Sequence, residues 1–212
     1  AETQVRASWG RFYQAQGIGE LQVEDGIDTF FPAQRADHLI LSIEHALTER
    51  ISARVEAYYK DYEELKPRFE NLFDPFVVLP ELQSDRIGIA PTAGLVRGVE
   101  FLVRDRSADP WGWWLGYTWS RAEGTVDLAH VPRSWDQRHT FNGGLSWTEG
   151  PWDLSLAGTW HTGWPTTPAT YTAEPEPAVT IGARNSTRFD DFRSVDVRAG
   201  YTFDLGDTEL LT

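Results

Sequence analysis

Residues 51–60 read Ile-Ser-Ala-Arg-Val-Glu-Ala-Tyr-Tyr-Lys, and this stretch decides the fold class. Successive side chains of a β-strand point to opposite faces, so a period of two in polarity predicts a strand with one apolar and one polar face. Odd-numbered positions here are apolar or aromatic, and even-numbered positions are mostly polar. The apolar face carries Ile51, Ala53, Val55, Ala57 and Tyr59, and the other face carries Ser52, Arg54, Glu56, Tyr58 and Lys60.

The same alternation recurs along the chain, and no segment has the pattern of a long amphipathic helix. The sequence therefore predicts an all-β, antiparallel fold. The further predicted strands are Thr3–Arg11, Asp37–Leu47, Val96–Arg104, Trp113–Arg121, Arg138–Thr148, Trp152–Thr162 and Ser194–Phe203, and a ninth begins near Thr208.

The connections between these strands alternate strictly between short and long. An up-and-down meander with short turns at one end and long loops at the other is typical of outer-membrane barrels. The short links are 48–50, 105–112, 149–151 and 204–207, and the long loops are about 12–36, 63–95, 122–137 and 163–193.

The two faces of the predicted strands fit a transmembrane barrel, in which the apolar face meets lipid and the polar face meets the lumen. Tryptophans of the apolar face lie beside the short turns (Trp113, Trp147, Trp152) or beside the long loops (Trp119, Trp160), as expected for two interfacial belts. The alternative is that these rings pack the core of a soluble sandwich. We expect Leu41, Val55, Phe101, Leu115, Leu145, Leu156 and Val197 to face lipid, and Glu56, Glu100, Thr118, Asn142, Thr159 and Arg198 to face the other side.

Composition narrows the class of protein further. A net charge of −13 over 212 residues argues against general nucleic-acid binding. The chain has no Cys, which excludes disulfides and thiolate metal sites. Mean hydropathy is −0.42, which is ordinary for strands with only one apolar face. No signal peptide opens the chain, so we expect any export signal to lie upstream.

Five stretches resemble TonB-dependent outer-membrane receptors, in the C-terminal part of their barrel. They resemble, in order, a strand with its loop, the entry into the next strand, the recurrent Gly-x-Glu strand, the descent into a late strand and the exit into a late loop. These stretches are SWGRFYQ (8–14) followed by Glu20-Leu21, FPAQRADH (31–38), GVEF (98–101), PRSWDQRH (132–139) and WHTGWPT (160–166).

The resemblance implies that residues 1–212 supply about nine strands of a barrel of about 22, whose N-terminal plug is absent from this chain. It further implies a receptor in the bacterial outer membrane that actively takes up a scarce nutrient such as a ferric siderophore. The implied partners are outer-membrane lipid, a small-molecule ligand such as a metal chelate, and the TonB energy-transducing protein, which would act through the missing N-terminal region. No cofactor is implied.

Candidate ligand contacts come from the predicted lumen face and from the last long loop, since loops often carry ligand-binding residues. For the lumen residues, cross-strand ion pairing is the competing interpretation. For the loop, the competing interpretation is a mobile polar segment. The candidates are Arg54, Glu100, Arg138, His161, Trp164 and Tyr171.

Other functional classes have less support in the sequence. No two of the five histidines form a His-x-x-x-His pair on one face, so we expect no dedicated metal site. No nucleophile elbow, phosphate loop or catalytic triad stands out, so we expect no enzyme. A small autonomous barrel with an adhesin or structural role is the main alternative. A carbohydrate-binding sandwich would need tryptophans clustered on one concave face, and these divide into two belts.

Overall fold

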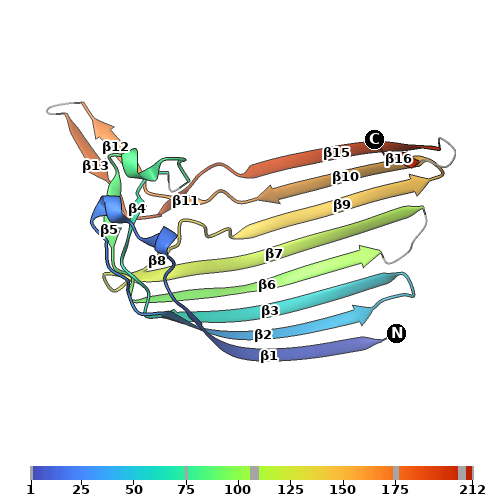
Figure 1. Ribbon diagram of the computed structural model, residues 1–212, viewed down its shortest axis with the longest axis horizontal. Coiled ribbons are helices and arrows are strands. Elements are labelled where there is room, and N and C mark those ends of the chain that lie inside the picture. Colours follow the sequence, from blue (N-terminus) through green and yellow to red (C-terminus); the bar gives the residue numbers. More distant parts are fainter. Residues whose placement is uncertain (1, 75, 106–109, 174–176, 205–208, 212) are drawn as a thin grey trace.

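One antiparallel sheet dominates the computed structural model, which describes residues 2–74, 76–105, 110–173, 177–204 and 209–211 (Figure 1). Its long strands are neighbours in chain order, as a meander requires. From one edge to the other they are β1 (Thr3–Gln14), β2 (Gln34–Ala46), β3 (Ile51–Glu63), β6 (Ala93–Asp105), β7 (Trp111–Val126), β9 (His139–Glu149), β10 (Trp152–His161), β15 (Phe192–Asp204) and β16 (Glu209–Leu211).

Small hairpins and turns build the long loops, all at one end of the sheet (Figure 1). Within the described ranges the only helical segments are three-residue turns, so the prediction of an all-β fold is confirmed. The short elements are β4 (Arg68–Asn71) paired with β5 (Arg86–Ile89), β8 (Ala129–Pro132) paired with β7, β11 (Pro165–Thr166) with β14 (Thr187–Arg188), β12 (Ala169–Thr172) with β13 (Ala178–Ile181), and the turns η1 (Ile18–Glu20), η2 (Val23–Asp25) and η3 (Pro80–Leu82).

All nine predicted strands are present, and several extend further toward the loops than predicted. β7 continues to Val126 instead of ending at Arg121. The extension is paired, because β8 folds back after the turn and forms a hairpin with residues 123–126 at the loop end of β7. The β9–β10 link is a tight turn in which Gly150 has φ +56°, a conformation that glycine adopts without steric cost. Of the predicted links 105–112 and 204–207, residues 106–109 and 205–207 lie outside the described residues.

The strand register confirms which residues share a face. Val55 lies opposite Phe101, and the same row continues across the sheet through Tyr117, Phe141 and Trp160. All seven residues predicted to face lipid belong to this face and are exposed, from 40% for Val55 and Leu145 to 77% for Val197. The six residues predicted for the opposite side all have the opposite parity in the register.

This row of partners also shows that the strands are staggered. It begins at Val5, near the start of β1, reaches Trp160, near the loop end of β10, and continues to Arg193 on β15. Phe141, near the start of β9, is the direct partner of Trp160. The register stagger moves the start of β9 up to the level of the loop-side belt. Such stagger accompanies the strand tilt of barrels.

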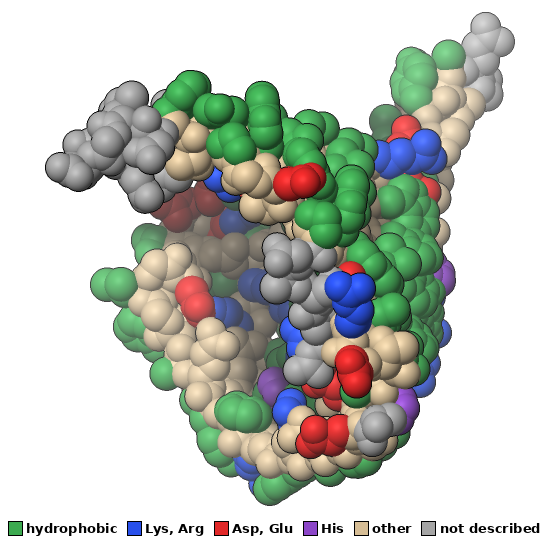
Figure 2. Space-filling model, turned by 90° about the vertical axis from the view of Figure 1, so that its right-hand side faces the viewer, with side chains coloured by type: hydrophobic (Ala, Val, Ile, Leu, Met, Phe, Trp, Pro, Cys, Tyr) green, Lys and Arg blue, Asp and Glu red, His purple; other side chains and the backbone are tan. Residues whose placement is uncertain are grey.

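The molecule is a curved wall with little conventional core. Its accessible surface is 14194 Å², whereas a compact soluble monomer of this mass exposes about 9,900 Å². Seen from the short-turn end, hydrophobic side chains lie on the outside of the wall and Lys and Arg appear within the hollow (Figure 2). Apart from glycines, the buried apolar residues of the described chain are Ile89, Val96, Ala122 and two prolines, Pro91 and Pro165, and all of them lie toward the loop end.

The wall does not close on itself among the described residues. β1 and β16 form the two ends of the strand order, and no pairing joins them. The two chain ends lie at opposite edges of the sheet in Figure 1. A continuous ladder between these edges is what a small autonomous barrel would require, since closure removes unpaired edges. The described part of the chain is therefore an open arc, as expected for about nine strands of a larger barrel.

Candidate functional site

Asp136 joins two of the long loops at the loop end of the wall. Its side chain is fully buried, and one carboxylate oxygen accepts a hydrogen bond from the backbone N–H of Ala122 at 2.6 Å. The other carboxylate oxygen contacts the guanidinium groups of Arg138 and Arg188. Arg188 also donates to the carbonyl oxygen of Gly163 at 2.9 Å. Buried carboxylates need such partners, and here the partners tie loop 127–138 to loop 162–191.

A second carboxylate, Glu70 on β4, connects the loop between β3 and β6 to the same assembly. It forms ion pairs with Arg68 and with Arg184 of the last long loop. The neighbouring Asn185 is buried, and its side-chain amide donates to the carbonyl oxygen of Pro132 at 2.7 Å. Loops that are separate in the sequence are thus held as one unit, which we call the loop cap (residues 15–33, 64–92, 127–138 and 162–191).

The first long loop is tied to the cap by Asp25 and Arg86. These side chains form an ion pair that is 12% and 10% exposed, respectively. The hydrogen bonds that Arg86 donates to the carboxylate of Asp25 raise the pKa of Arg86 above its usual value. Nearby, Gln22 exchanges two hydrogen bonds with the backbone of Phe69, at 2.7 and 3.0 Å. A guanidinium held this way fixes the orientation of both loops.

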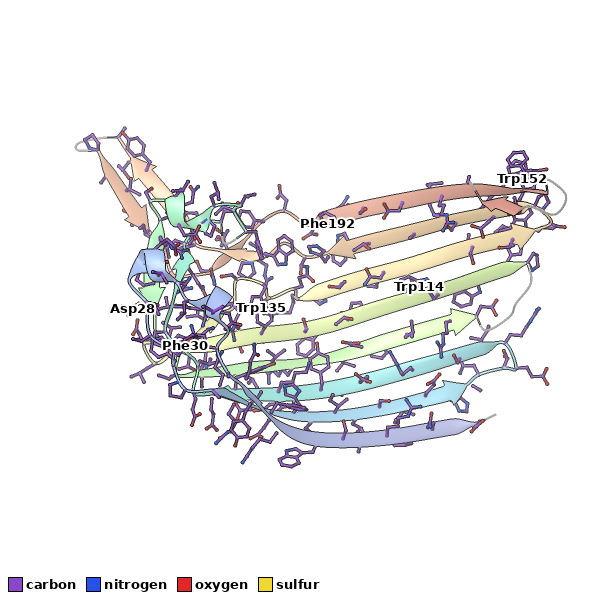
Figure 3. All side chains as sticks on the ribbon, in the orientation of Figure 1. Asp28, Phe30, Trp114, Trp135, Trp152 and Phe192 are labelled. Carbon is purple, nitrogen blue, oxygen red and sulfur yellow. The ribbon has the colours of Figure 1, made fainter. Side chains whose placement is uncertain are left out.

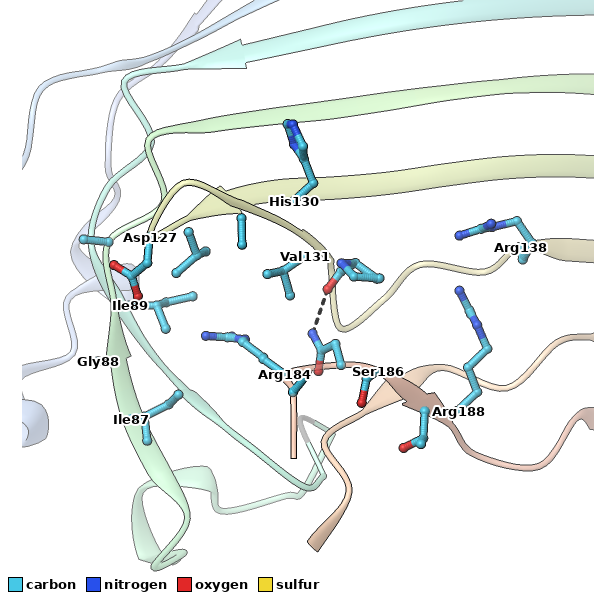
Figure 4. A pocket seen from close by; sticks show the side chains of 17 residues that line it. Ile87, Gly88, Ile89, Asp127, His130, Val131, Arg138, Arg184, Ser186 and Arg188 are labelled. Carbon is cyan, nitrogen blue, oxygen red and sulfur yellow. Dashed lines mark hydrogen bonds between the residues drawn. The ribbon is translucent and has the colours of Figure 1, made fainter. Parts of the chain in front are cut away.

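The largest hollow of the cap is about 910 Å³ and is lined by β5, the β7–β8 hairpin and residues 183–188 (Figure 4). Its cationic side chains are Arg138, Arg184 and Arg188, with His130 beside them. Buried Nε of Arg138 and Nη1 of Arg184 have no hydrogen-bond partner. Burial lowers the pKa of Arg184, but a guanidinium keeps its proton in proteins. The hollow is therefore lined by three guanidinium groups, and two of them carry a buried nitrogen without a partner.

Two smaller hollows are lined by aromatic rings. One, of about 360 Å³, contains His161, whose ring stacks on Phe192 at 4.9 Å and lies 5.2 Å from Trp164. The other, of about 330 Å³, lies between His38 and Arg133, whose buried Nε2 and Nε atoms lack partners. Figure 3 shows Trp135, which lines this second hollow, at the loop end, and Trp152 at the short-turn end.

The structure brings some of the predicted ligand contacts together and separates others. His161 and Trp164 share one hollow, and Arg138 lines the largest one. Arg54 and Glu100 lie far down the wall on its polar face, at neighbouring register positions. Tyr171 lies on β12, is 66% exposed and lines none of the three hollows described above.

Sequence reasoning missed the residues that organise the cap. Asp136 lies inside the quoted stretch 132–139, but nothing in its spacing marks it as buried. The strands that carry Glu70 and Arg188 have only four and two residues, which is too short for a period of two in polarity to be recognised. Arg184 lies in a turn, where no such period is expected. For the predicted long loop at about 163–193, the two interpretations are a ligand-binding loop and a mobile polar segment. In its described part, the pairings β11–β14 and β12–β13 and the buried Asn185 give the loop ordered structure.

Ion pairing explains only part of the polar face. Arg104 bonds Glu44 at 3.3 Å, two strands away, but Glu56 lies directly opposite Glu100. Among the described residues, no group of three or more His, Cys, Asp or Glu side chains could hold a metal ion. No helix in the described part of the chain is long and apolar enough to cross a membrane.

Comparison with known proteins identifies the family. The model of the TonB-dependent receptor-like β-barrel matches residues 1–210. No curated protein matches the chain. Among solved structures, FpvA of P. aeruginosa in complex with a heterologous ferric pyoverdine has a TM-score of 0.57 at 15% identity, covering 94% of this chain and 25% of that one. FpvAI in complex with pyocin S2 has a TM-score of 0.56 at 14% identity, with the same coverage.

These likenesses agree with the geometry of the wall. At such low identity the solved structures show a shared fold, and this chain spans about a quarter of their length. The family match covers nearly the whole chain and rests on the same strands whose apolar face is exposed here. The chain belongs to the β-barrel of the TonB-dependent receptors, a family of non-enzymatic transporters of the outer membrane.

Proposed function

We propose that the chain is the C-terminal portion of a receptor that takes up a scarce nutrient such as a ferric siderophore across the outer membrane, with energy from the TonB system. The observation that carries the proposal is the hollow of about 910 Å³ in the loop cap, lined by Arg138, Arg184 and Arg188. Small-molecule sites are typically about 300–1,000 Å³. Guanidinium groups suit the carboxylate, catecholate or hydroxamate oxygens of an anionic chelate.

The position of this hollow supports a role in ligand capture. It lies at the end of the wall with the long loops, which in outer-membrane barrels is the extracellular end. One solved structure of similar fold, FpvA, was determined with a ferric pyoverdine. The hollow with His161 and Trp164 adds aromatic surface on the same side. A ligand held by the cap would be released into the polar interior of the wall, where Arg54 and Glu100 lie.

The proposal requires no bond-breaking chemistry from this chain. Binding by the cap and release through the lumen use differences in affinity, and the energy for release would come from the TonB protein acting on an N-terminal plug. We assign that plug and the first barrel strands to sequence outside these 212 residues, since the matched structures are about four times longer.

Uptake in cells tests the proposal. The complete gene would be deleted from its host, and accumulation of radioactive iron would be measured with ferric hydroxamate, catecholate and hydroxycarboxylate chelates. We expect accumulation from at least one chelate to fall in the deletion strain, and to fall equally in a strain lacking the energy-transducing partner. If the deletion changes accumulation from none of these chelates under iron limitation, the iron-uptake proposal is wrong.

Variants of the complete protein test the site. Replacing Arg138 and Arg184 by Gln should weaken binding of that chelate roughly a hundredfold, because two charge-assisted hydrogen bonds of about 1.5 kcal/mol each are lost. The matched control is Arg6→Gln/Arg198→Gln, which removes the same two charges from the polar face of the wall away from the cap. Equal affinities of both variants for the chelate would exclude the hollow as its binding site.

A further inference from the structure

The hollow of about 360 Å³ that contains His161 has a charge opposite to that of the arginine-lined hollow. Three carboxylates line it, and none of its lining residues is Lys or Arg. The carboxylates belong to Asp74, in the loop between β3 and β6, and to Asp190 and Asp191, just before β15. We call this cavity the acidic hollow. Its other walls are aromatic, so it combines negative charge with apolar surface.

Aromatic rings form the apolar part of the acidic hollow. The ring centroids of Phe76 and Trp164 are 4.4 Å apart. His161 and Phe192 are Cα partners in the β10–β15 register, and Figure 3 shows Phe192 at the loop-side start of β15. Phe76, Phe189 and Phe192 remain 46%, 41% and 47% exposed. Uncovered faces of such rings attract cations through the negative charge of their π-systems.

Backbone contacts fix the shape of the acidic hollow. A Cβ atom at Gly163 would clash with the backbone carbonyl group of Phe189, so only glycine allows the two segments to approach this closely. The backbone N–H of Phe189 donates to the carbonyl oxygen of Trp164 at 2.9 Å. The carboxylate of Asp191 accepts a hydrogen bond from the backbone N–H of Gly163 at 3.3 Å. The acidic hollow therefore exists without a ligand.

His161 adds a hydrogen-bond acceptor to the acidic hollow. Its side chain is buried, with 7% exposed, and its Nδ1 lies 2.9 Å from the carbonyl oxygen of Thr162. A carbonyl oxygen can only accept, so Nδ1 carries the hydrogen and Nε2 of the neutral ring is an acceptor. Within the described part of the chain, Nε2 has no hydrogen-bond partner. This nearly buried side chain thus has an unused acceptor.

Cationic side chains of the described chain leave the acidic hollow without a counter-charge. Its three carboxylates form no ion pair with described residues. Arg188 donates to the carbonyl oxygen of Gly163 from the neighbouring hollow, but its guanidinium is already paired with Asp136. No group of His, Cys, Asp and Glu side chains among the described residues could hold a metal ion. The complementary ligand is therefore an organic cation that is large enough to contact the rings.

We propose that the acidic hollow binds a protonated primary amine on an alkyl stem. The ammonium group donates hydrogen bonds to Nε2 of His161 and to the carboxylates of Asp190 and Asp191, and the stem lies against the rings of Trp164 and Phe192. A quaternary ammonium group would use the rings but has no hydrogen to donate. Use of this site by cargo of the loop cap rests on the function proposed above, whereas binding of the amine itself does not.

Ligand-observed NMR titrations of the complete detergent-solubilised protein test the assignment. The probes are butylammonium and 1-butanol, which have the same stem. We expect butylammonium to bind at least roughly tenfold more tightly than 1-butanol, and Asp190→Asn/Asp191→Asn to remove that difference. The control is Glu24→Gln/Asp28→Asn, which removes two exposed carboxylates from the first long loop and should leave the difference intact. Equal binding of the two probes by the unchanged protein would overturn the proposal.

A second variant tests the primary amine specifically. His161→Phe keeps an aromatic ring and removes the acceptor, so it should weaken binding of butylammonium and leave binding of tetramethylammonium unchanged. Equal weakening of both cations would show that the acceptor of His161 does not bind the amine. Neither titration involves an iron chelate, so the results do not depend on the uptake experiment. Tight butylammonium binding beside unchanged iron uptake in the deletion strain would reject the proposed function alone.

Discussion

Arg188 on β14 donates a hydrogen bond to the backbone carbonyl oxygen of Asp136 at 2.7 Å, while its other terminal nitrogen contacts the carboxylate of the same residue. Arg188 therefore binds both the main chain and the side chain of a residue that lies 52 positions earlier in the sequence. Because the carboxylate of Asp136 is fully buried, this contact decides how the last two long loops are placed around the largest hollow.

Substitution of Asp136 by Asn should open the loop cap without unfolding the wall. Removing one partner of a buried ion pair costs about 3–5 kcal/mol, because the remaining charges are left uncompensated. We expect faster hydrogen exchange in residues 127–138 and 162–191 and unchanged exchange in β2 and β3. Asp190→Asn is the control, since Asp190 is exposed and lies in the same loop. Unchanged exchange in both loops would show that Asp136 does not hold them.

A positive charge should be tolerated on one face of β10 and not on the other. Leu156→Lys places a charge on the lipid-facing side near mid-strand, which costs about 2–4 kcal/mol in a barrel. Ser155→Lys, one residue away, places it on the opposite face and should cost little. Unfolding free energies of the complete protein in lipid bilayers measure both. Similar losses for the two variants would contradict the assignment of the faces.

Removing one carboxylate of the Glu56–Glu100 pair should stabilise the wall. The two side chains are direct cross-strand neighbours on the polar face, and like charges in that position destabilise by roughly 0.2–1 kcal/mol. We therefore expect Glu100→Gln to raise the unfolding free energy at neutral pH. Glu44→Gln removes the same charge but breaks the ion pair with Arg104, so it should lower stability. A loss of stability in both variants would indicate that Glu100 has a partner of its own.

Acidification should loosen the first long loop. The hydrogen bond and charge of Lys66 hold the pKa of Glu20 below its usual 4.5. A carboxyl group whose pKa is lowered by folding contributes stability above 4.5, and that contribution is lost as the pH falls through the lowered value. Proteolysis within residues 15–33, with an acid-stable protease, should therefore accelerate in that range. Lys66→Gln should show the fast rate already at neutral pH. A rate that is independent of pH in the unchanged protein would refute the prediction.

The sequence by itself determined the wall. A period of two in polarity can be satisfied only by strands with distinct faces, so residues 51–60 and their seven counterparts specify both the strands and their orientation. Alternating link lengths then specify the order of strands and the end that carries the loops. These are local properties, because each strand needs only its own side chains to choose a face, and the register found here agrees at every predicted position.

Only the tertiary structure decided the loop cap. Asp136, Glu70 and Arg184 owe their roles to contacts across 52 to 114 positions of sequence, and no local pattern encodes such a distance. The same holds for the surroundings of Tyr171, which lies on β12 and is 66% exposed. A loop carboxylate holds neighbouring loops together when it is buried among their cationic side chains. Its burial is decided only when loops that are distant in the sequence come into contact.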